Sequence, residues 1–384
     1  MFFIIRVSKT TQERVLKEDL TMKKKVIAAM LTACMAFGMA ACGASGGGNA
    51  ADGTQSGGSA SNANAGSDGN ITIGFSQVGA ESDWRTANST SMKETFSEEN
   101  GYTLIFDDAQ QKQENQLTAI RNFIQQEVDY IVLAPVTETG WDTVLQEAKD
   151  AGIPVIIVDR MVDVSDDSLY TAWVGSNFEL EGKKACAWLD AYLQAAGRGD
   201  DKINIVDIQG TIGASAQIGR TAGLEDAVKG HDNWTLLASE SGEFTQAKGQ
   251  EVMESMLKQY GDDIDVVYCE NDNEAFGAID AIEAAGYKVG PDGDILVMSF
   301  DSTNAGLTDV ENGKIICNTE CNPLHGPRVQ EIIDKLEAGE TPDKQQYVDE
   351  EIFAGVDSVT SIKVDDQDYP VTLVTDDVIK ARAY

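Results

Sequence analysis

The chain has 384 residues, 42% of them hydrophobic, which is enough for more than one globular domain with a buried core. Its 64 acidic and 29 basic residues give a formal charge of −35, so it repels phosphate backbones, and nucleic acid is excluded as an expected partner. We interpret the excess of acidic residues as a solvated surface that keeps the protein in solution.

An export signal is predicted near the N-terminus. Lys23, Lys24 and Lys25 precede an apolar run that ends in small residues, which is the pattern of a signal peptide over 22–41. The sequence MAAC, which ends at Cys42, resembles a bacterial lipobox, so we expect lipidation of Cys42; an ordinary signal peptide with a chance cysteine is the alternative.

Two further segments flank this signal. Residues 1–21 fit no part of it, and we interpret them as an upstream extension, with translation starting at Met22. Residues 42–69 are rich in Gly, Ser, Ala and Asn and offer nothing that could bury a core, so we predict a flexible tether. Together, a disordered N-terminal segment and a lipid would hold a soluble domain at a membrane surface without spanning it.

Short apolar runs alternate with amphipathic segments from residue 71 onward. Nearly continuous apolar strands between helices indicate a buried parallel sheet covered on both faces. The pattern occurs twice, so the expected fold class is α/β, with two doubly wound parallel-sheet lobes. Strands are expected at 71–75, 103–106, 130–134, 155–158, 203–208, 234–239, 266–269 and 295–299, and helices at 113–126, 141–150, 179–193, 216–229, 247–259 and 274–284.

Polar side chains crowd the ends of these strands, where ligands bind in open α/β sheets. Each has a simpler interpretation: Asp107 and Asp272, taken singly, are better explained as helix caps, and Trp84 could be a core residue. A sugar, however, needs hydrogen-bond donors, acceptors and an apolar surface for its ring in one place. We therefore predict a carbohydrate cleft. Its strand-end residues are Trp84, Arg85, Asp159, Arg160, Asn271 and Asp301.

Catalytic and metal-binding patterns are sparse. The sequence contains no P-loop lysine motif and no GxSxG, and no GxGxxG follows a strand. The sequence has two histidines, His231 and His325, which are few for a catalytic triad or a histidine-based metal site. His325 is expected at a helix start. A glycosidase pair of carboxylates is an alternative, but neighbouring arginines would keep such carboxylates ionised. We expect no enzyme activity, no cofactor and no metal.

The six cysteines form no CxxC pair, which argues against a zinc site. Cys317 and Cys321 lie four residues apart and could form a disulfide. Two unlinked, partly buried thiols are the preferred interpretation.

Long segments resemble one protein family. GFSQVGAESDWR, GWDTVLQEAKDAGIPVIIVDR and ENDNEAFGAIDAIEAAG are similar to the type I periplasmic sugar-binding proteins of ABC importers, the ribose- and galactose-binding family, and most of all to its galactofuranose-binding members. The resemblance runs from Ile71 to about Leu336. It implies two lobes joined by a three-strand hinge that crosses near 175–177, 320–322 and 351. The implied N-terminal lobe is 70–176 plus 321–351, and the C-terminal lobe is 177–320 plus 352–384.

The resemblance also implies a ligand and its contacts. A monosaccharide, galactofuranose or a related hexose or pentose, is expected between lobes that close on it. Two departures are visible: Ile203 and Asp265 occupy the positions of a disulfide known in the family, and Asp83 replaces a glycine, which could alter the preferred hydroxyl. The implied binding residues are Glu81, Ser82, Asp83, Trp84, Arg85, Asp159, Arg160, Arg220, Asn271 and Asp301, with Gln77, Gln110 and Glu320 as additions.

The implied role is that of the extracytoplasmic binding component of an ABC sugar importer. We expect a monomer, lipid-anchored at the outer face of the cytoplasmic membrane, that delivers its sugar to the permease. Two alternatives are a binding protein that feeds a sensor kinase and a secreted glycoside-acting enzyme. A sugar-responsive repressor shares the fold, but it would need a helix-turn-helix where the signal peptide lies.

Overall fold

A computed structural model describes residues 69–384 of the chain. The predicted extension, the signal peptide and Cys42, together with nearly all of the predicted tether, lie outside these residues. Among residues 69–384, no helix is both long enough and apolar enough to cross a bilayer.

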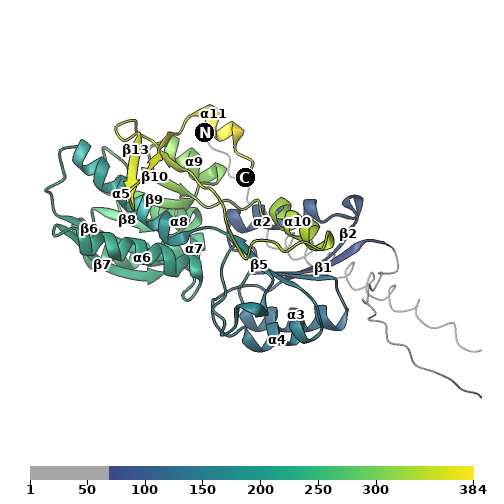
Figure 1. Ribbon diagram of the computed structural model, residues 1–384. Helices are drawn as coiled ribbons and strands as arrows, with labels where there is room; N and C mark the ends of the chain where they lie inside the picture. The colour runs from purple at the N-terminus through teal and green to yellow at the C-terminus, as the bar shows by residue number, and fades with distance from the viewer. Residues whose placement is uncertain (1–68) are drawn as a thin grey trace, which may run out of the picture. The chain divides into compact units, whose positions relative to one another are not determined.

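The first sheet has six parallel strands in the order β11-β5-β4-β3-β1-β2. Helices α2 and α10 pack on one face of this sheet and helices α3 and α4 on the other, each through its own hydrophobic cluster (Figure 1). The strands are β1 (Ile71–Gln77), β2 (Tyr102–Asp108), β3 (Tyr130–Leu133), β4 (Val155–Val158), β5 (Ala172–Gly175) and β11 (Gln345–Tyr347), and the helices are α2 (Asp83–Thr95), α3 (Gln113–Gln125), α4 (Asp142–Asp150) and α10 (Gly326–Glu337).

The second sheet has seven strands in the order β15-β12-β10-β9-β8-β6-β7, and only the β10–β12 pair is antiparallel among its described strands. Helices α5 and α6 cover one face, and α7, α8 and α9 cover the other. The strands are β6 (Ile203–Gln209), β7 (Trp234–Ser241), β8 (Val266–Cys269), β9 (Leu296–Asp301), β10 (Cys317–Glu320), β12 (Ile352–Ala354) and β15 (Thr372–Leu373), and the helices are α5 (Phe178–Ala195), α6 (Ser215–Gly230), α7 (Gln246–Tyr260), α8 (Asp272–Ala284) and α9 (Asn304–Glu311).

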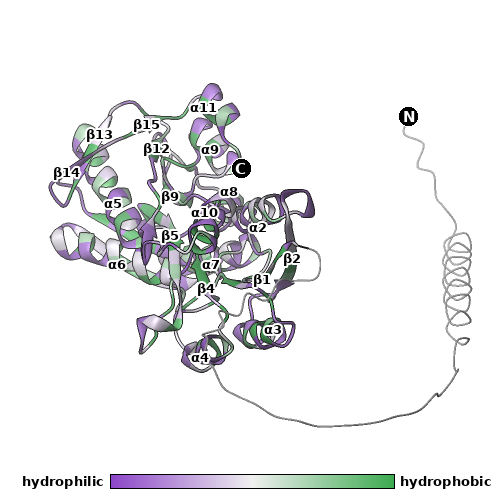
Figure 2. Cartoon of the chain, turned by 45° about the vertical axis from the view of Figure 1, so that its right-hand side comes forward, coloured by the Kyte–Doolittle hydropathy of each residue, from purple (hydrophilic) through white to green (hydrophobic). Residues whose placement is uncertain are grey.

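A hairpin and a short helix complete the C-terminal part of the chain. The hairpin pairs β13 (Ser361–Val364) with β14 (Gln367–Pro370) and packs on α5, and the last helix is α11 (Asp376–Ala381). Figure 2 shows that helices α3 and α4 carry both hydrophilic and hydrophobic residues. This is the pattern expected of helices that bury one side against a sheet.

The alternation of apolar strands and amphipathic helices therefore predicts the fold class correctly. Strands 155–158 and 266–269 have the predicted bounds. Some local predictions are wrong. No helix is predicted between residues 75 and 103, but α2 begins at Asp83, and Asp107 lies within β2 instead of capping a helix. At the start of α8 the capping side chain is Asn271, and Asp272 instead binds Ser299 and Thr303.

The chain passes between the two sheets three times. It leaves the first sheet after β5, returns from β10 to α10, and leaves again between β11 and β12. We call residues 176–177, 321–325 and 348–351 the crossing segments. They are hydrogen-bonded to one another, since Glu350 Oε1 accepts from Ser176 Oγ at 2.5 Å and from the Asn322 amide at 2.8 Å.

The described cysteines are unlinked. Cys186, Cys269, Cys317 and Cys321 are all free and buried. The preferred interpretation of Cys317 and Cys321 as separate thiols therefore holds, although both are fully buried where partial burial was expected. His325 precedes the first residue of α10, as predicted for a helix start.

Candidate functional site

A small hollow lies where the carboxyl ends of the two sheets face each other. Residues from both sheets and from one crossing segment line it, so it depends on long-range folding and not on one motif. The lining consists of Glu81, Ser82, Trp84, Arg85, Asp159, Arg160, Phe178, Ala216, Arg220, Phe244, Asn271, Asp301 and Cys321.

The first half of the site is a compact set of opposite charges. Ser82 caps α2 by accepting from the Arg85 amide, which turns Trp84 and Arg85 inward in the first helical turn. Arg85 Nη2 lies 2.7 Å from Asp159 Oδ2, and Arg85 Nε donates to Glu81 Oε1 at 3.0 Å. Arg160 Nη2 is 3.9 Å from the same Glu81 oxygen.

These pairs favour the charged forms of Asp159 and Arg85. Burial by itself would raise the pKa of Asp159, but the guanidinium groups of Arg85 and Arg160 lower it below its ordinary value. Burial would likewise lower the pKa of Arg85, and Asp159 and Glu81 raise it instead. Burial and the charge of Arg85 lower the pKa of Arg160 to about 10, so this guanidinium also stays charged at neutral pH.

The second half of the site is built around a single arginine. Arg220 Nε donates to Glu181 Oε2 at 2.8 Å, Nη2 lies 3.4 Å from Asp301 Oδ1, and Nη1 donates to the Glu270 carbonyl. Burial raises the pKa values of Glu181 and Asp301, and Arg220 offsets this only in part. Burial also raises the pKa of Glu270 well above its ordinary value, so burial shifts several acids of this half toward the protonated form.

Aromatic rings complete the lining. The Trp84 indole donates to the Cys321 carbonyl at 2.6 Å, and the guanidinium of Arg85 lies 4.6 Å from the indole centroid. Arg160 lies 5.0 Å from the ring centroid of Phe244. Phe244 reaches the site because residue 210 is glycine, since a Cβ there would come within 1.9 Å of the ring. The site therefore offers charged donors, carboxylate acceptors and flat apolar faces together.

Buried acceptors in and behind the lining are incompletely satisfied. Within residues 69–384, Glu81 Oε2 in the lining and Glu181 Oε1 behind it accept no hydrogen bond, and Asp159 Oδ2 accepts no aligned hydrogen bond but forms the ion pair with Arg85. Buried polar atoms are normally satisfied, so unsatisfied acceptors around a hollow indicate a ligand that donates hydrogen bonds.

Backbone conformation is unusual at matching places in both sheets. Asp159 follows β4 with φ of 62°, and Asp301 ends β9 with φ of 95°. Both φ values are unfavourable for residues other than glycine, and such conformations cluster at ligand sites. They turn the carboxylates of Asp159 and Asp301 toward the hollow.

The structure leaves four predicted residues outside the lining. Asp83 is exposed because the helical turn that buries Trp84 and Arg85 points it outward, and Gln110 is exposed after edge strand β2. Gln77 is buried behind the site, where its Oε1 accepts from Arg85 Nη1 at 3.3 Å. Glu320 pairs with the C-terminal residues instead. Its carboxylate forms an ion pair with Arg382 Nη2 at 2.9 Å and accepts a hydrogen bond from Tyr384 OH at 2.8 Å.

Sequence reasoning missed Phe178, Ala216, Phe244 and Cys321. Phe178 directly follows one predicted crossing and Cys321 lies within another, and Phe244 lies in the loop after β7, so the strand-end rule could have found it. Loops of the two halves also touch around the hollow. The Glu138 amide donates to the Gly213 carbonyl at 2.9 Å, and the Met161 amide donates to Ser215 Oγ at 2.8 Å.

A family model described as a periplasmic binding protein domain matches residues 73–319. The chain belongs to this family. It is 43% identical to the galactofuranose-binding protein YtfQ of Escherichia coli, over 71% of this chain and 85% of that protein. It is 28% identical to the fructose import binding protein FruE of Bifidobacterium longum, over 86% of this chain and 94% of that protein.

Solved structures agree. A Mycobacterium smegmatis protein in complex with β-D-fucofuranose has a TM-score of 0.71 and 43% identity, and the match covers 75% of this chain and 92% of that chain. A second structure is the binding protein of the arabinose ABC transporter of Shewanella sp. ANA-3, bound to α- and β-L-arabinofuranose. It has a TM-score of 0.69 and 42% identity, and the match covers 74% of this chain and 92% of that chain. These matches confirm the resemblance and the type I periplasmic binding protein fold, and these relatives are binding proteins, not enzymes.

Proposed function

We propose that the protein binds a monosaccharide in the hollow between its two sheets. The main support is the lining of the hollow, where the carboxylates of Glu81 and Asp159, the guanidinium groups of Arg85, Arg160 and Arg220, and the Trp84 indole lie together, and where Glu81 Oε2 has no hydrogen-bond partner among the described residues. A polyol satisfies such acceptors with its hydroxyl protons, and its hydroxyl oxygens accept from the three lining arginines. The indole of Trp84 gives the C–H face of the ring an apolar surface to pack on.

The ring form we propose is a furanose, galactofuranose or a related hexose or pentose. Three structural neighbours at 41–43% identity are described with fucofuranose, galactofuranose or arabinofuranose. Nine of the predicted binding residues line the hollow, and we propose all nine as contacts: Glu81, Ser82, Trp84, Arg85, Asp159, Arg160, Arg220, Asn271 and Asp301. Asp83 is exposed, so we no longer expect it to select among hydroxyl groups.

We further propose that the protein is the binding component of an ABC sugar importer, anchored by lipid at Cys42 and monomeric. Ligand would shift the two lobes toward a closed form that docks on the permease. The names of the relatives favour transport over the alternative of feeding a sensor kinase. A glycoside-acting enzyme is disfavoured because the relatives are named as sugar-binding proteins.

Isothermal calorimetry against a panel of sugars tests this function. We expect heat of binding with galactose, arabinose or fucose, which equilibrate with their furanose forms. We expect none with 1,5-anhydro-D-galactitol, which is locked as a pyranose ring and adds no bulk. Equal affinity for the locked compound would contradict the furanose assignment. If no sugar of the panel, ribose and glucose included, gave a heat of binding, sugar binding would be contradicted.

A further inference from the structure

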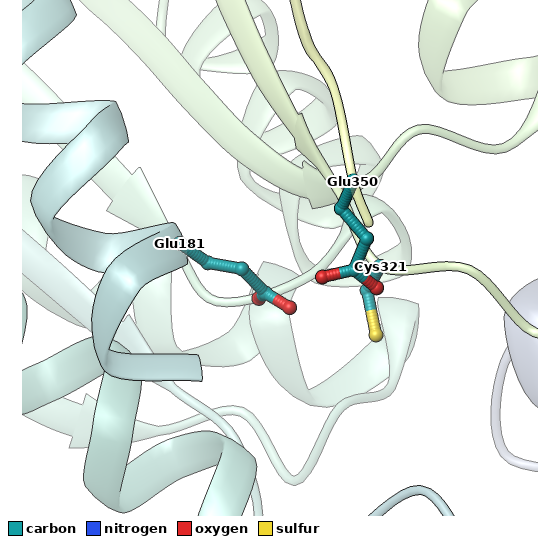
Figure 3. A group of neighbouring side chains, drawn as sticks. All are labelled: Glu181, Cys321 and Glu350. Atoms are coloured by element: carbon teal, nitrogen blue, oxygen red, sulfur yellow. The ribbon is translucent and has the colours of Figure 1, made fainter. Parts of the chain in front are cut away.

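A cluster of acids lies directly behind the proposed sugar site. Figure 3 shows Glu181, Cys321 and Glu350 pointing toward one another, and a ligand-type atom of each lies within 4.8 Å of the other two. Glu181 belongs to the first turns of α5, whereas Cys321 and Glu350 belong to two of the crossing segments. The cluster therefore connects one lobe to the connection between the lobes.

Glu350 ties the crossing segments together. Its Oε1 accepts from Ser176 in the first segment and from the Asn322 amide in the second, while Glu350 itself lies in the third. Lys184 of α5 adds a hydrogen bond from Nζ to the Glu350 carbonyl at 2.9 Å. The position of the Glu350 carboxyl is thus fixed by all three segments.

Glu181 is fixed from the opposite side, by Arg220. The backbones of α5 and α6 touch because both carry glycine at the contact: a Cβ on Gly223 would come within 2.7 Å of Gly182. This close approach places Glu181 Oε2 2.8 Å from Arg220 Nε, with both side chains 2% exposed. Glu181 Oε1 is buried toward the cluster and accepts no hydrogen bond from any described residue.

Two ionised carboxylates at this separation would repel each other strongly in a buried environment. A proton on one of them converts the repulsion into a hydrogen bond and supplies the missing partner of Glu181 Oε1. A divalent cation fits this gap less well, because Arg220 and Lys184 already place positive charge beside it. The other charged or titratable groups that face the pair are Arg220 from α6, Lys184 from α5, Asp301 from β9, Glu320 from β10, Cys321 and Asp349.

We propose that Glu181 and Glu350 share one proton, and that this shared proton makes Glu181 a positioning residue that holds Arg220 in place for the sugar. This inference rests on the proposed function, because it takes Arg220 to be a sugar contact. Burial raises the pKa values of both carboxyls, which agrees with a proton retained near neutral pH. Burial also raises the pKa of the Cys321 thiol, which keeps it neutral beside the pair.

The proton and the sugar are then linked. Loss of the proton at alkaline pH leaves two buried like charges, and their repulsion displaces Glu181, and Arg220 with it, from the position that serves the sugar. Sugar affinity therefore falls as the pH rises. By reciprocity, sugar binding draws a proton onto the pair at a pH where it is partly ionised.

Calorimetry over pH 6 to 9.5, in buffers of different ionisation enthalpy, measures both effects. For the wild type we expect Kd to rise several-fold toward alkaline pH, with net proton uptake on binding. Glu350→Gln keeps a hydrogen-bond donor for Glu181 without a titratable group, so it should bind at the neutral-pH affinity with a flat profile and no proton uptake. Glu181→Gln removes the anionic partner of Arg220 and should bind more weakly at every pH.

Asp207→Asn is the matched control, since Asp207 is a buried acid of the same lobe that lies outside the hollow. It should retain the wild-type binding profile. The shared proton would be contradicted if the Kd of the wild type did not change with pH, or if Glu350→Gln showed the same dependence of Kd on pH as the wild type. Infrared difference spectra give a reading that needs no sugar: a protonated-carboxyl C=O band present in the wild type should be missing in Glu350→Gln. If that band is lost but no sugar binds at any pH, the proton is real and the proposed function fails instead.

Discussion

The two halves of the site have the same topology and opposite electrostatics. Along each sheet the order is the same, β2-β1-β3-β4-β5 in the first and β7-β6-β8-β9-β10 in the second. The first half balances Arg85 and Arg160 against Glu81 and Asp159, whereas the second half sets Arg220 among an excess of buried acids. The fold thus decides where site residues come from, and the local balance of charge decides whether those residues hold protons.

This difference predicts opposite responses to pH. In the first half the pKa of Asp159 is lowered by folding, so its contribution to stability is present at neutral pH and is lost as the pH falls. In the second half the pKa values of Asp301, Glu270 and Glu181 are raised, so their contribution is present in acid and is lost as the pH rises.

The largest expected effect comes from removing a cation of the first half. Arg85→Met leaves Glu81 and Asp159 buried without their main partner, and we expect unfolding free energy to fall by about 3–5 kcal/mol in urea titrations. Arg220→Met should cost less, and the cost should shrink at lower pH, because its partner acids already favour protons. Equal costs for the two variants at all pH values would contradict the contrast between the halves.

Arg160→Ala tests the contribution of the first half to binding. It removes a buried guanidinium that lies against Phe244 and donates to the Val136 carbonyl at 3.0 Å. We expect sugar affinity measured by calorimetry to fall by about 3 kcal/mol, since a charged donor to the ligand is lost. Arg121→Ala, which breaks an exposed ion pair with Glu147, is the control and should bind normally. Near-native affinity in Arg160→Ala would remove this residue from the site.

Asp207→Asn sharpens the picture of the second half. Burial raises the pKa of Asp207 to about 8 from an ordinary 3.8, and neither carboxylate oxygen has a hydrogen-bond partner among the described residues. Between these values the folded state holds a proton that the unfolded state has released, so stability falls with rising pH. We expect Asp207→Asn to remove a slope of about 1.4 kcal/mol per pH unit, as measured by unfolding between pH 5 and 7. The exposed Asp232→Asn should leave the slope unchanged.

Gly210→Ala has the smallest expected effect. The added methyl group would displace the Phe244 ring from the hollow, and we expect sugar affinity to fall by about 1 kcal/mol. Gly230→Ala, at the end of α6 with open space around it, is the matched control. Wild-type binding by Gly210→Ala would mean that Phe244 does not shape the site.

Much of the site could be predicted because strand ends in parallel sheets converge. That rule found Asp159, Arg160, Asn271 and Asp301 from apolar runs alone. The resemblance also implied Asp83, which is exposed because the phase of an unpredicted helix decides which of three consecutive residues faces inward. It implied Glu320 as well, but the partners of this acid, Arg382 and Tyr384, are more than sixty residues away along the chain and only the folded structure brings them together.

The family resemblance supplied what patterns could not. Arg220 lies six residues into α6, beyond the end of the preceding strand, and the resemblance identified it as a binding residue. The shared-proton pair was invisible in the sequence, because Glu181 and Glu350 meet only through a helix and a crossing segment 169 positions apart.

Trp84 gives the molecule a built-in optical reporter. The other tryptophans, Trp141, Trp173, Trp188 and Trp234, are packed in the hydrophobic clusters, whereas the Trp84 ring borders the hollow beside the Arg85 cation. Ligand entry changes the field and the quenching groups around this one indole, so emission intensity should follow occupancy without any attached dye. The same property would let the protein serve as a reagentless fluorescent sensor for its own ligand.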